Sequence, residues 1–285
     1  MFSDFRHRTC DDAPVTRIAI VAAMHEELVA LLEAMPYEAA VRRAGRDFWV
    51  GRLEGHEVVA VLARIGKVAA ATTATLLAAE FAVDFAVFIG TAGGLHERAR
   101  VGDVVVAEAL MQHDLDASPI FPRYEVPLYG VDRFPSDRKL SAALAEAARA
   151  VLDAALRGTG DVVGLDAEFL LACGIDSPRV HTGLVVSGDR FVANAAESRD
   201  LRLRLPDALA VEMEGAALAQ VCHDFGIPFA VVRTISDRAD DSAHLDFRRF
   251  SGSLASRYAL AIVRRFLAEF GDGRGCGPLQ GRSGG

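Results

Sequence analysis

Short runs of β-branched and other apolar residues alternate along most of the chain with longer stretches rich in Ala and Leu. This alternation is typical of strands that feed helices in an α/β sheet. The first pair is a buried strand over 17–23 followed by a helix over 26–35, in which apolar residues recur at helical spacing. The pattern then predicts a hairpin over 47–64, an Ala-rich helix from Gly66 to about Phe81, strands over 84–89, 103–107, 182–186, 208–211 and 229–234, and helices over 136–156, 215–225 and 247–270.

Three segments interrupt this alternation. The sequence GTAGGL at 90–95 predicts a tight glycine-rich turn after a strand. Segment 113–135 is rich in Pro and aromatic residues without a helical or strand period, which predicts a long loop of the functional kind. Segment 157–179 is predicted to be an irregular insertion.

The same pattern predicts a single domain. No linker rich in Pro, Gly or Ser divides 17–270. We expect residues 1–16 to form a flexible leader. Residues 271–285 are so rich in glycine that they cannot bury enough side chain to offset the entropy of ordering, which predicts a disordered tail.

Charge and composition narrow the class of protein. The chain has 31 Lys and Arg against 39 Asp and Glu, a net charge of −8, which argues against nucleic acid as a partner. No stretch of about 18 uncharged apolar residues is present, so no membrane partner is expected. The four cysteines are widely scattered, without a CxxC pair or a zinc spacing, and we expect a cytoplasmic protein.

Polar residues follow four of the predicted strands. The segments are MHEE at 24–27, GTAGG at 90–94, VEMEG at 211–215 and RTISD at 233–237. Because the carboxyl ends of strands in open α/β sheets meet around one crevice, these segments predict one candidate site.

Each carboxylate in these segments also has an ordinary structural interpretation. Glu26 and Glu27 fall in the first turn of a helix, where the helix dipole favours negative charge. Glu212 and Glu214 flank Met213 and should point in different directions, so we expect at most one of them to face the crevice. Asp237 could serve as a turn or cap residue in SDRADD.

Several other chemistries are disfavoured. His113, Asp114 and Asp116 superficially resemble metal ligands, but neighbours on an extended chain point to alternate faces, so no metal site is expected. GTAGG lacks the full GxGxxG spacing of a dinucleotide site, and the chain has neither a GxSxG elbow nor a GxxxxGK[ST] loop. We therefore expect no cofactor.

Taken in order and spacing, the segments AAMHEEL, RIGKVAAA, GTAGGL with VGDVVVAE, VVSGDRFV, AVEMEGAALAQVC and FAVVRTISDRAD resemble the nucleoside phosphorylase and nucleosidase superfamily. They are most similar to its 5′-methylthioadenosine/S-adenosylhomocysteine nucleosidases, over roughly residues 17–267. The resemblance implies a mixed central sheet flanked by helices, a small nucleoside as substrate, hydrolytic release of adenine and a homodimer. Segment 157–179 and the sequence ASPIFPRYEVPLYG depart from the compact family members.

The resemblance also assigns roles to individual residues. Glu27 corresponds to the residue that activates the attacking water, and Arg233 to one that supports the water side. Asp237 corresponds to the acid that protonates purine N7, with Ser236 beside it. In the substrate-binding positions, Glu214 would grip the ribose hydroxyls, Met213 and Thr91 would lie near the sugar, and Phe191 and Val192 would hold the adenine.

The chemistry of the reaction asks for such residues independently. An N-glycosidic bond breaks through an oxocarbenium-like sugar, so an acid must neutralise the departing base while a carboxylate prepares water on the opposite face. A further carboxylate can accept two hydroxyl hydrogen bonds from a ribose diol and stabilise positive charge on the sugar.

Three alternatives stay open at this point. They are a phosphorylase on the same fold, a nucleosidase for another adenosine derivative such as aminodeoxyfutalosine, and a non-catalytic nucleoside-binding module. A paired acid and base argue against the binding module. Against the phosphorylase, Phe88 stands where hexameric relatives have an arginine and MHEE replaces their phosphate loop, although Arg64 is a nearby cation.

Overall fold

The computed structural model describes residues 16–271 except 161, 163, 241–242, 244–246, 248–249 and 251–253. The predicted leader and tail lie outside the described residues, apart from Thr16 and Gly271 at their borders. Over the part of the chain that is described, no helix is long and apolar enough to cross a membrane.

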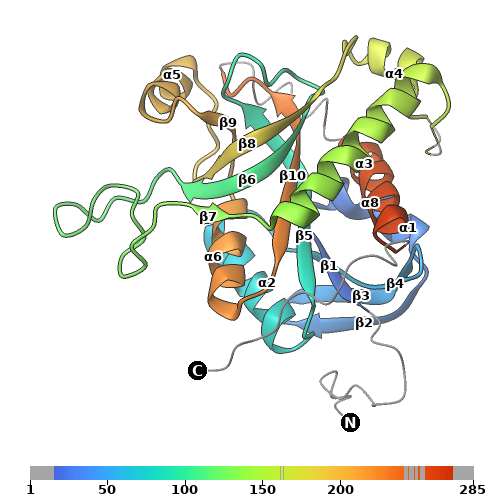
Figure 1. Ribbon diagram of the computed structural model, residues 1–285, viewed down its shortest axis with the longest axis horizontal. Coiled ribbons are helices and arrows are strands. Elements are labelled where there is room, and N and C mark those ends of the chain that lie inside the picture. Colours follow the sequence, from blue (N-terminus) through green and yellow to red (C-terminus); the bar gives the residue numbers. More distant parts are fainter. Residues whose placement is uncertain are drawn as a thin grey trace.

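A mixed sheet forms the centre of the molecule (Figure 1). Strand β10 (Phe229–Asp237) pairs in parallel with β5 (Phe85–Gly94). The same two strands are also joined through β6 (Val104–Gln112), β8 (Val180–Ser187) and β9 (Ala208–Glu212), so these five strands close into a ring. A short strand, β7 (Phe134–Pro135), pairs with β6. The strand order is β10 (Phe229–Asp237), β6 (Val104–Gln112), β8 (Val180–Ser187), β9 (Ala208–Glu212), β5 (Phe85–Gly94), β1 (Arg17–Ala22), β4 (His56–Leu62), β3 (Arg46–Leu53) and β2 (Tyr37–Arg43).

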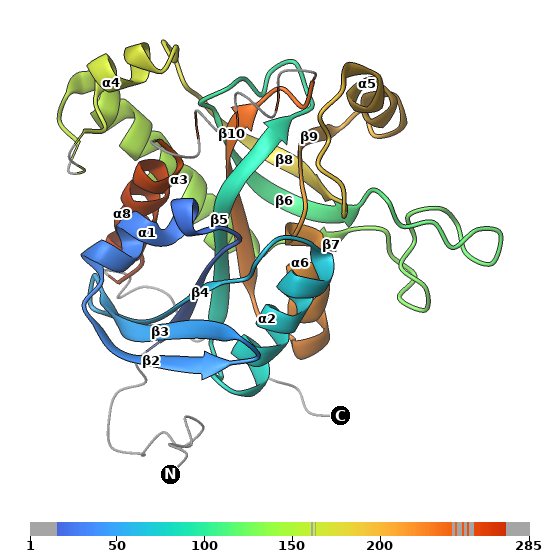
Figure 2. The same cartoon turned by 180° about the vertical axis from the view of Figure 1, so that it is seen from behind.

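Helices cover both faces of this sheet (Figures 1 and 2). On one face, α1 (His25–Ala34), α3 (Arg138–Arg157) and α8 (Ser256–Gly271) bury one apolar core. On the other, α2 (Lys67–Ala79) and α6 (Gly215–Phe225) bury a second core. The predicted fold class, a mixed central sheet flanked by helices, is confirmed.

The GTAGGL segment is not the tight turn that its glycines predict. Residues up to Gly94 continue β5, with Thr91 opposite Thr234 of β10 and Gly93 opposite Val211 of β9. A Cβ atom on Gly94 would lie 2.4 Å from the Ala99 carbonyl oxygen. The glycines therefore allow close approach of neighbouring backbone within a strand, a use that the sequence pattern does not distinguish from a turn.

Three further elements differ from the prediction. Strand β2 was not expected, because it is an edge strand whose residues are mostly exposed and polar. Helix α5 (Ala195–Arg204) was missed because only Ser198 and Leu201 are buried in it. The predicted irregular insertion contains a short helix, α4 (Ala167–Ala172), which Asp166 caps by accepting a hydrogen bond from the Phe169 amide.

Candidate active site

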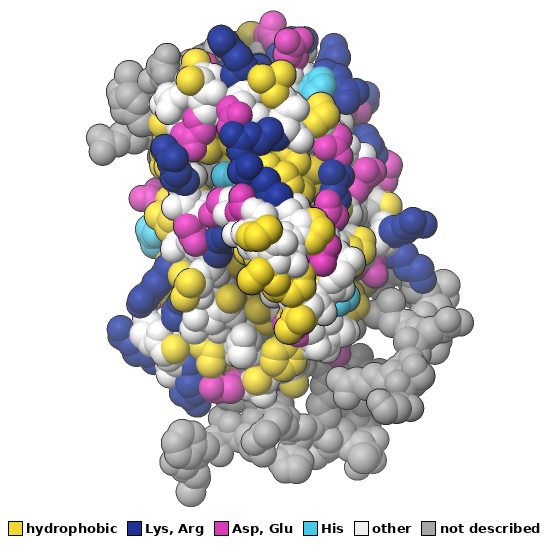
Figure 3. Space-filling model, turned by 90° about the vertical axis from the view of Figure 1, so that its left-hand side faces the viewer, with side chains coloured by type: hydrophobic (Ala, Val, Ile, Leu, Met, Phe, Trp, Pro, Cys, Tyr) yellow, Lys and Arg dark blue, Asp and Glu magenta, His cyan; other side chains and the backbone are white. Residues whose placement is uncertain are grey.

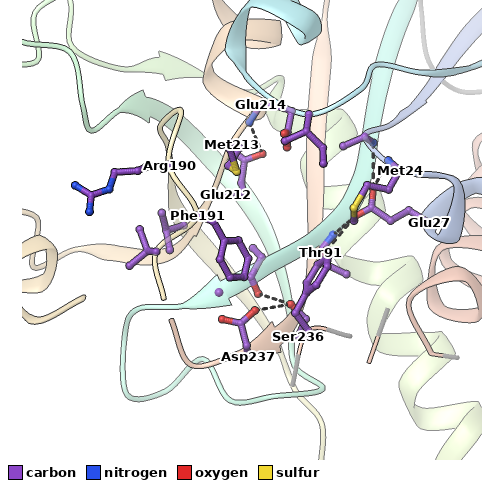
Figure 4. Close-up of a pocket in the computed structure, with 17 residues that line it drawn as sticks. Met24, Glu27, Thr91, Arg190, Phe191, Glu212, Met213, Glu214, Ser236 and Asp237 are labelled. Carbon is purple, nitrogen blue, oxygen red and sulfur yellow. Dashed lines mark hydrogen bonds between the residues drawn. The ribbon is translucent and has the colours of Figure 1, made fainter. Parts of the chain in front are cut away.

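The C-terminal ends of β5, β9 and β10 and the segments that follow β1 and β9 surround a cavity of about 380 Å³ (Figure 4). The structure brings eight of the nine predicted site residues to its wall and leaves out Arg233. Apolar side chains supply much of the rest. The predicted residues that line the cavity are Glu27, Thr91, Phe191, Val192, Met213, Glu214, Ser236 and Asp237.

Glu27 is held in one orientation by four hydrogen bonds. Its Oε2 accepts from the amides of Ala23 (3.0 Å) and Met24 (3.1 Å), which lead into α1, and its Oε1 accepts from the amide and hydroxyl of Thr91, both at 2.9 Å. Burial raises the pKa of Glu27, and the charge of Arg233 and these hydrogen bonds only partly oppose that shift. Glu27 therefore lies in the first turn of α1, as its structural interpretation expects, and its carboxylate is fixed in orientation at the cavity wall.

Arg233 lies behind Glu27 and does not reach the cavity surface. Its guanidinium lies 4.2 Å from the centre of the Phe88 ring and donates to Glu212 at 2.6 Å. A Cβ atom on Gly90 would lie 3.0 Å from both Arg233 Nη1 and Glu27 Oε1, so the absence of a side chain there lets the two groups approach. The position fits a supporting role on this side of the cavity and not direct contact with a bound molecule.

Both glutamates of VEMEG line the cavity, contrary to the expectation that only one would. Their hydrogen bonds do diverge. Glu212 accepts from the Gly215 amide, Ser187 Oγ and Arg233, so it is the one that caps and pairs. Glu212 was not predicted as a site residue, although the VEMEG pattern had singled it out.

Glu214 accepts a 2.8 Å hydrogen bond from the Gly66 amide. Gly66 has a φ of +98°, a left-handed conformation that favours glycine and turns its N–H toward the cavity. Burial, followed by the negative charge of Glu212, raises the pKa of Glu214 to about 8. A ligand with hydroxyl donors would satisfy this carboxylate when it is ionised.

This raised pKa predicts how stability depends on pH. A carboxyl group that binds its proton more tightly in the folded state stabilises the fold below its unfolded pKa, and the contribution disappears as the pH rises through about 8. We expect the melting temperature of the wild type to fall more between pH 5.5 and pH 8.5 than that of Glu214→Gln. Parallel pH dependences for the two proteins, measured by calorimetry, would contradict the assignment.

Asp237 lies on a different side of the cavity from Glu27 and is 2% exposed. Its Oδ2 accepts from Ser236 Oγ and its Oδ1 from the Ala239 amide, both at 2.8 Å. Figure 4 shows Glu27 and Asp237 on different sides of the cavity. Two buried carboxyl groups that face one space from different directions can act on two ends of a bound molecule.

An aromatic and aliphatic wall completes the cavity. The half-exposed ring of Phe191 meets the ring of Phe247 edge-on, with centroids 5.8 Å apart, whereas Val192 is buried in the core beneath α5. Met24 and Ile65 add apolar surface. Met24, Ile65 and Phe247 were missed, because lone apolar residues beside polar motifs carry no signal that separates a pocket wall from ordinary core.

A family model, the phosphorylase superfamily, matches residues 17–268. The chain therefore belongs to this superfamily, and it is an enzyme of the nucleoside phosphorylase and nucleosidase class. The resemblance inferred from the sequence motifs is confirmed.

Solved structures of known enzymes are similar over nearly the whole chain. The 5′-methylthioadenosine/S-adenosylhomocysteine nucleosidase of Neisseria meningitidis, in complex with methylthio-immucillin-A, shares 32% identity at a TM-score of 0.75, covering 90% of this chain and 100% of that one. The Streptococcus pneumoniae nucleosidase shares 31% (TM-score 0.74, 90% and 100% covered). The futalosine hydrolase of Helicobacter pylori shares 29% (TM-score 0.74, 90% and 98% covered).

Proposed function

We propose that this enzyme hydrolyses the N-glycosidic bond of 5′-thio-substituted adenosines, such as methylthioadenosine and S-adenosylhomocysteine, and releases adenine. The observation that carries the proposal is the pair of buried carboxyl groups, Glu27 and Asp237, on different sides of one cavity. Glu27 would activate water while Asp237, with Ser236 beside it, protonates the departing purine. No cofactor enters this scheme.

The remaining wall would bind the nucleoside. Glu214 would accept the ribose hydroxyls, with Met213 and Thr91 near the sugar. Phe191 would stack on the adenine, and Val192 would contribute main-chain hydrogen bonds to it. The apolar surface of Met24, Ile65 and Phe247 suits an uncharged 5′-thioether.

Charge around the cavity supports water over phosphate as the nucleophile. Among the described residues that line it, Arg190 is the one basic residue, and its side chain points away from the cavity toward Glu197, 3.3 Å distant. Arg64, the cation that could have weakened this argument, donates to the Gly45 carbonyl and is not part of the wall. A desolvated phosphate dianion needs fixed positive charge, and the described residues of the wall direct none into the cavity.

A product assay tests the proposal. We expect adenine and free 5-methylthioribose from methylthioadenosine in phosphate-free buffer, at a rate that added phosphate does not change. A ribose 1-phosphate product, or adenine release that requires phosphate, would identify a phosphorylase instead. Binding without turnover of any substrate would favour the non-catalytic module.

A second candidate substrate is an adenosine derivative with another 5′ group, such as aminodeoxyfutalosine. The observation in its favour is that the Helicobacter pylori futalosine hydrolase is nearly as similar to this chain as the nucleosidases are. Comparing kcat/KM for methylthioadenosine, S-adenosylhomocysteine, adenosine and aminodeoxyfutalosine ranks the candidates directly.

The two free cysteines of the described chain, Cys173 and Cys222, support a reducing cytoplasm as the place of the reaction.

We also propose a homodimer, built on the loop between β6 and β7. Ile120 is 82% exposed and Leu128 is 91% exposed in this loop, and Tyr129 and Val131 are partly exposed. The loop projects from the body of the molecule, and Figure 3 shows hydrophobic side chains gathered on the face toward which it extends. Contiguous exposed apolar surface of this kind marks an interaction site.

Light scattering at micromolar concentration is expected to give twice the mass of one chain for the wild type. Leu128→Asp should shift the protein toward the monomer, because a charge would then have to be buried at the interface. Leu171→Asp is the matched control, since Leu171 is 61% exposed on α4, away from this loop. A wild type that scatters as a single chain would exclude the dimer.

A further inference from the structure

Two carboxylates and a lysine form a closed ring of hydrogen bonds beside the cavity. Lys67 Nζ donates to Asp114 Oδ1 at 2.6 Å, and the Asp189 amide donates to Asp114 Oδ2 at 2.9 Å. The ring closes where the Lys67 amide, in the first turn of α2, donates to Asp189 Oδ1 at 2.8 Å. Asp114, one of the residues that superficially resemble metal ligands in the sequence, belongs to this ring.

The ring joins two parts of the site that belong to different segments. On one side, Lys67 directly follows Gly66, whose amide holds Glu214. On the other side, Asp189 lies just before Phe191 and Val192, the residues proposed to hold the purine. Neither Lys67 nor Asp114 is among the described residues that line the cavity.

The neighbourhood favours the ionised form of Asp114 and holds its carboxylate in place. Burial acts to raise the pKa of Asp114, but the hydrogen bonds from Lys67 and the Asp189 amide, with the charge of Lys67, outweigh it and leave the pKa below its usual range. The Lys67 side chain is 16% exposed and also donates to Gln112 Oε1 at 3.1 Å, which in turn is fixed by Gln220 of α6.

We propose that Lys67 and Asp114 are positioning residues that set the distance between the sugar-binding carboxylate Glu214 and the purine-binding segment at Phe191. This inference rests on the proposed function, because it assumes a ligand that spans both parts. A ligand that touches only the purine segment would not need the two parts in register. A ligand that joins purine to ribose needs the two parts in register, because displacement of one part prevents the ligand from contacting both parts at the same time.

Binding of two probes tests this directly. Adenine can contact the purine-binding segment but has no ribose for Glu214, whereas tubercidin, the 7-deaza analogue of adenosine, joins the base to a ribose but lacks the N7 that hydrolysis would protonate. We expect Lys67→Met and Asp114→Asn to raise the Kd of tubercidin about tenfold or more, equivalent to at least about 1.4 kcal/mol, and to leave that of adenine within about threefold. Asp114→Asn keeps the volume of the side chain, so it still allows the test if the Lys67→Met variant does not fold.

A double mutant separates positioning from general damage. If Asp114 acts through Glu214, adding Asp114→Asn to Glu214→Gln should weaken tubercidin binding by no more than about twofold beyond Glu214→Gln alone. The matched control is Glu80→Gln, which breaks the 2.8 Å pair with Arg43 at the opposite end of α2 and should change neither Kd.

Equal losses for adenine and tubercidin, or additive losses in the double mutant, would overturn the positioning role. A wild type that binds tubercidin but releases adenine from no nucleoside would refute the proposed hydrolysis while leaving this inference standing. A wild type that binds neither probe would refute both.

Discussion

Glu27→Gln is expected to lower kcat by about a hundredfold or more while the protein stays folded, because a neutral amide cannot take the proton of the attacking water. The amide also places an N–H₂ group against donors that the carboxylate now accepts from, either the Ala23 and Met24 amides or Thr91. A modest fall in melting temperature should therefore accompany the loss of activity. Turnover is measured as adenine release at saturating methylthioadenosine.

The neighbouring residue provides the control. Glu26 is exposed in the same helical turn, so Glu26→Gln should keep normal turnover. The wild type should also lose kcat/KM as the pH falls below the pKa of Glu27, which burial raises above 4.5, since the base must be ionised to act. Near-normal turnover of Glu27→Gln would show that another residue acts as the general base.

Asp237→Asn should be comparably damaging for a purine nucleoside, with a loss of about a hundredfold or more, because adenine leaves poorly unless it is protonated. The loss should depend on the leaving group. A p-nitrophenyl riboside releases a phenolate that needs no proton, so its cleavage should fall less than about tenfold in the variant. Rates for both substrates, taken with wild type and variant in parallel, check this difference.

Ser236→Ala provides a milder perturbation of Asp237 for comparison with Asp237→Asn. It removes the 2.8 Å hydrogen bond to Asp237 Oδ2 but keeps the carboxyl group and the bond from the Ala239 amide. Its effect on nucleoside cleavage should be smaller than that of Asp237→Asn. If Asp237→Asn slowed both substrates equally, Asp237 would be holding the site together and not protonating the purine.

Much of the fold could be predicted from the sequence because it depends on local patterns of apolar and polar residues. The buried run that became β1 and the alternation of strands with Ala-rich helices follow from which residues can be removed from water. The elements that escaped prediction, β2, α4 and α5, are those with few buried residues. Their signal in the sequence is weak because neighbouring structure, and not their own apolar face, holds them in place.

The candidate site shows the same division. The segments that hold Glu27, Glu214 and Asp237 could be singled out because polar residues at several strand ends converge on one crevice, and the resemblance to the superfamily selected these three carboxylates within them. Phe247 and Ile65 could not, since a single apolar residue has the same pattern in a pocket wall as in a core. Their place in the wall depends on segments far apart in the chain.

By itself, then, the sequence determined the order of the strands and helices that bury an apolar face, the resemblance to the superfamily and the segments of polar residues at the strand ends, because each depends on residue type and on the spacing of motifs. Only the tertiary structure decided that GTAGG extends a strand, that Arg233 lies behind Glu27, and that Asp114 belongs to a ring with Lys67 and Asp189. These depend on contacts between segments far apart in the chain, as where Thr91 of β5 lies opposite Thr234 of β10. Local propensity carries no information about such pairing, because folding the chain is what creates those contacts.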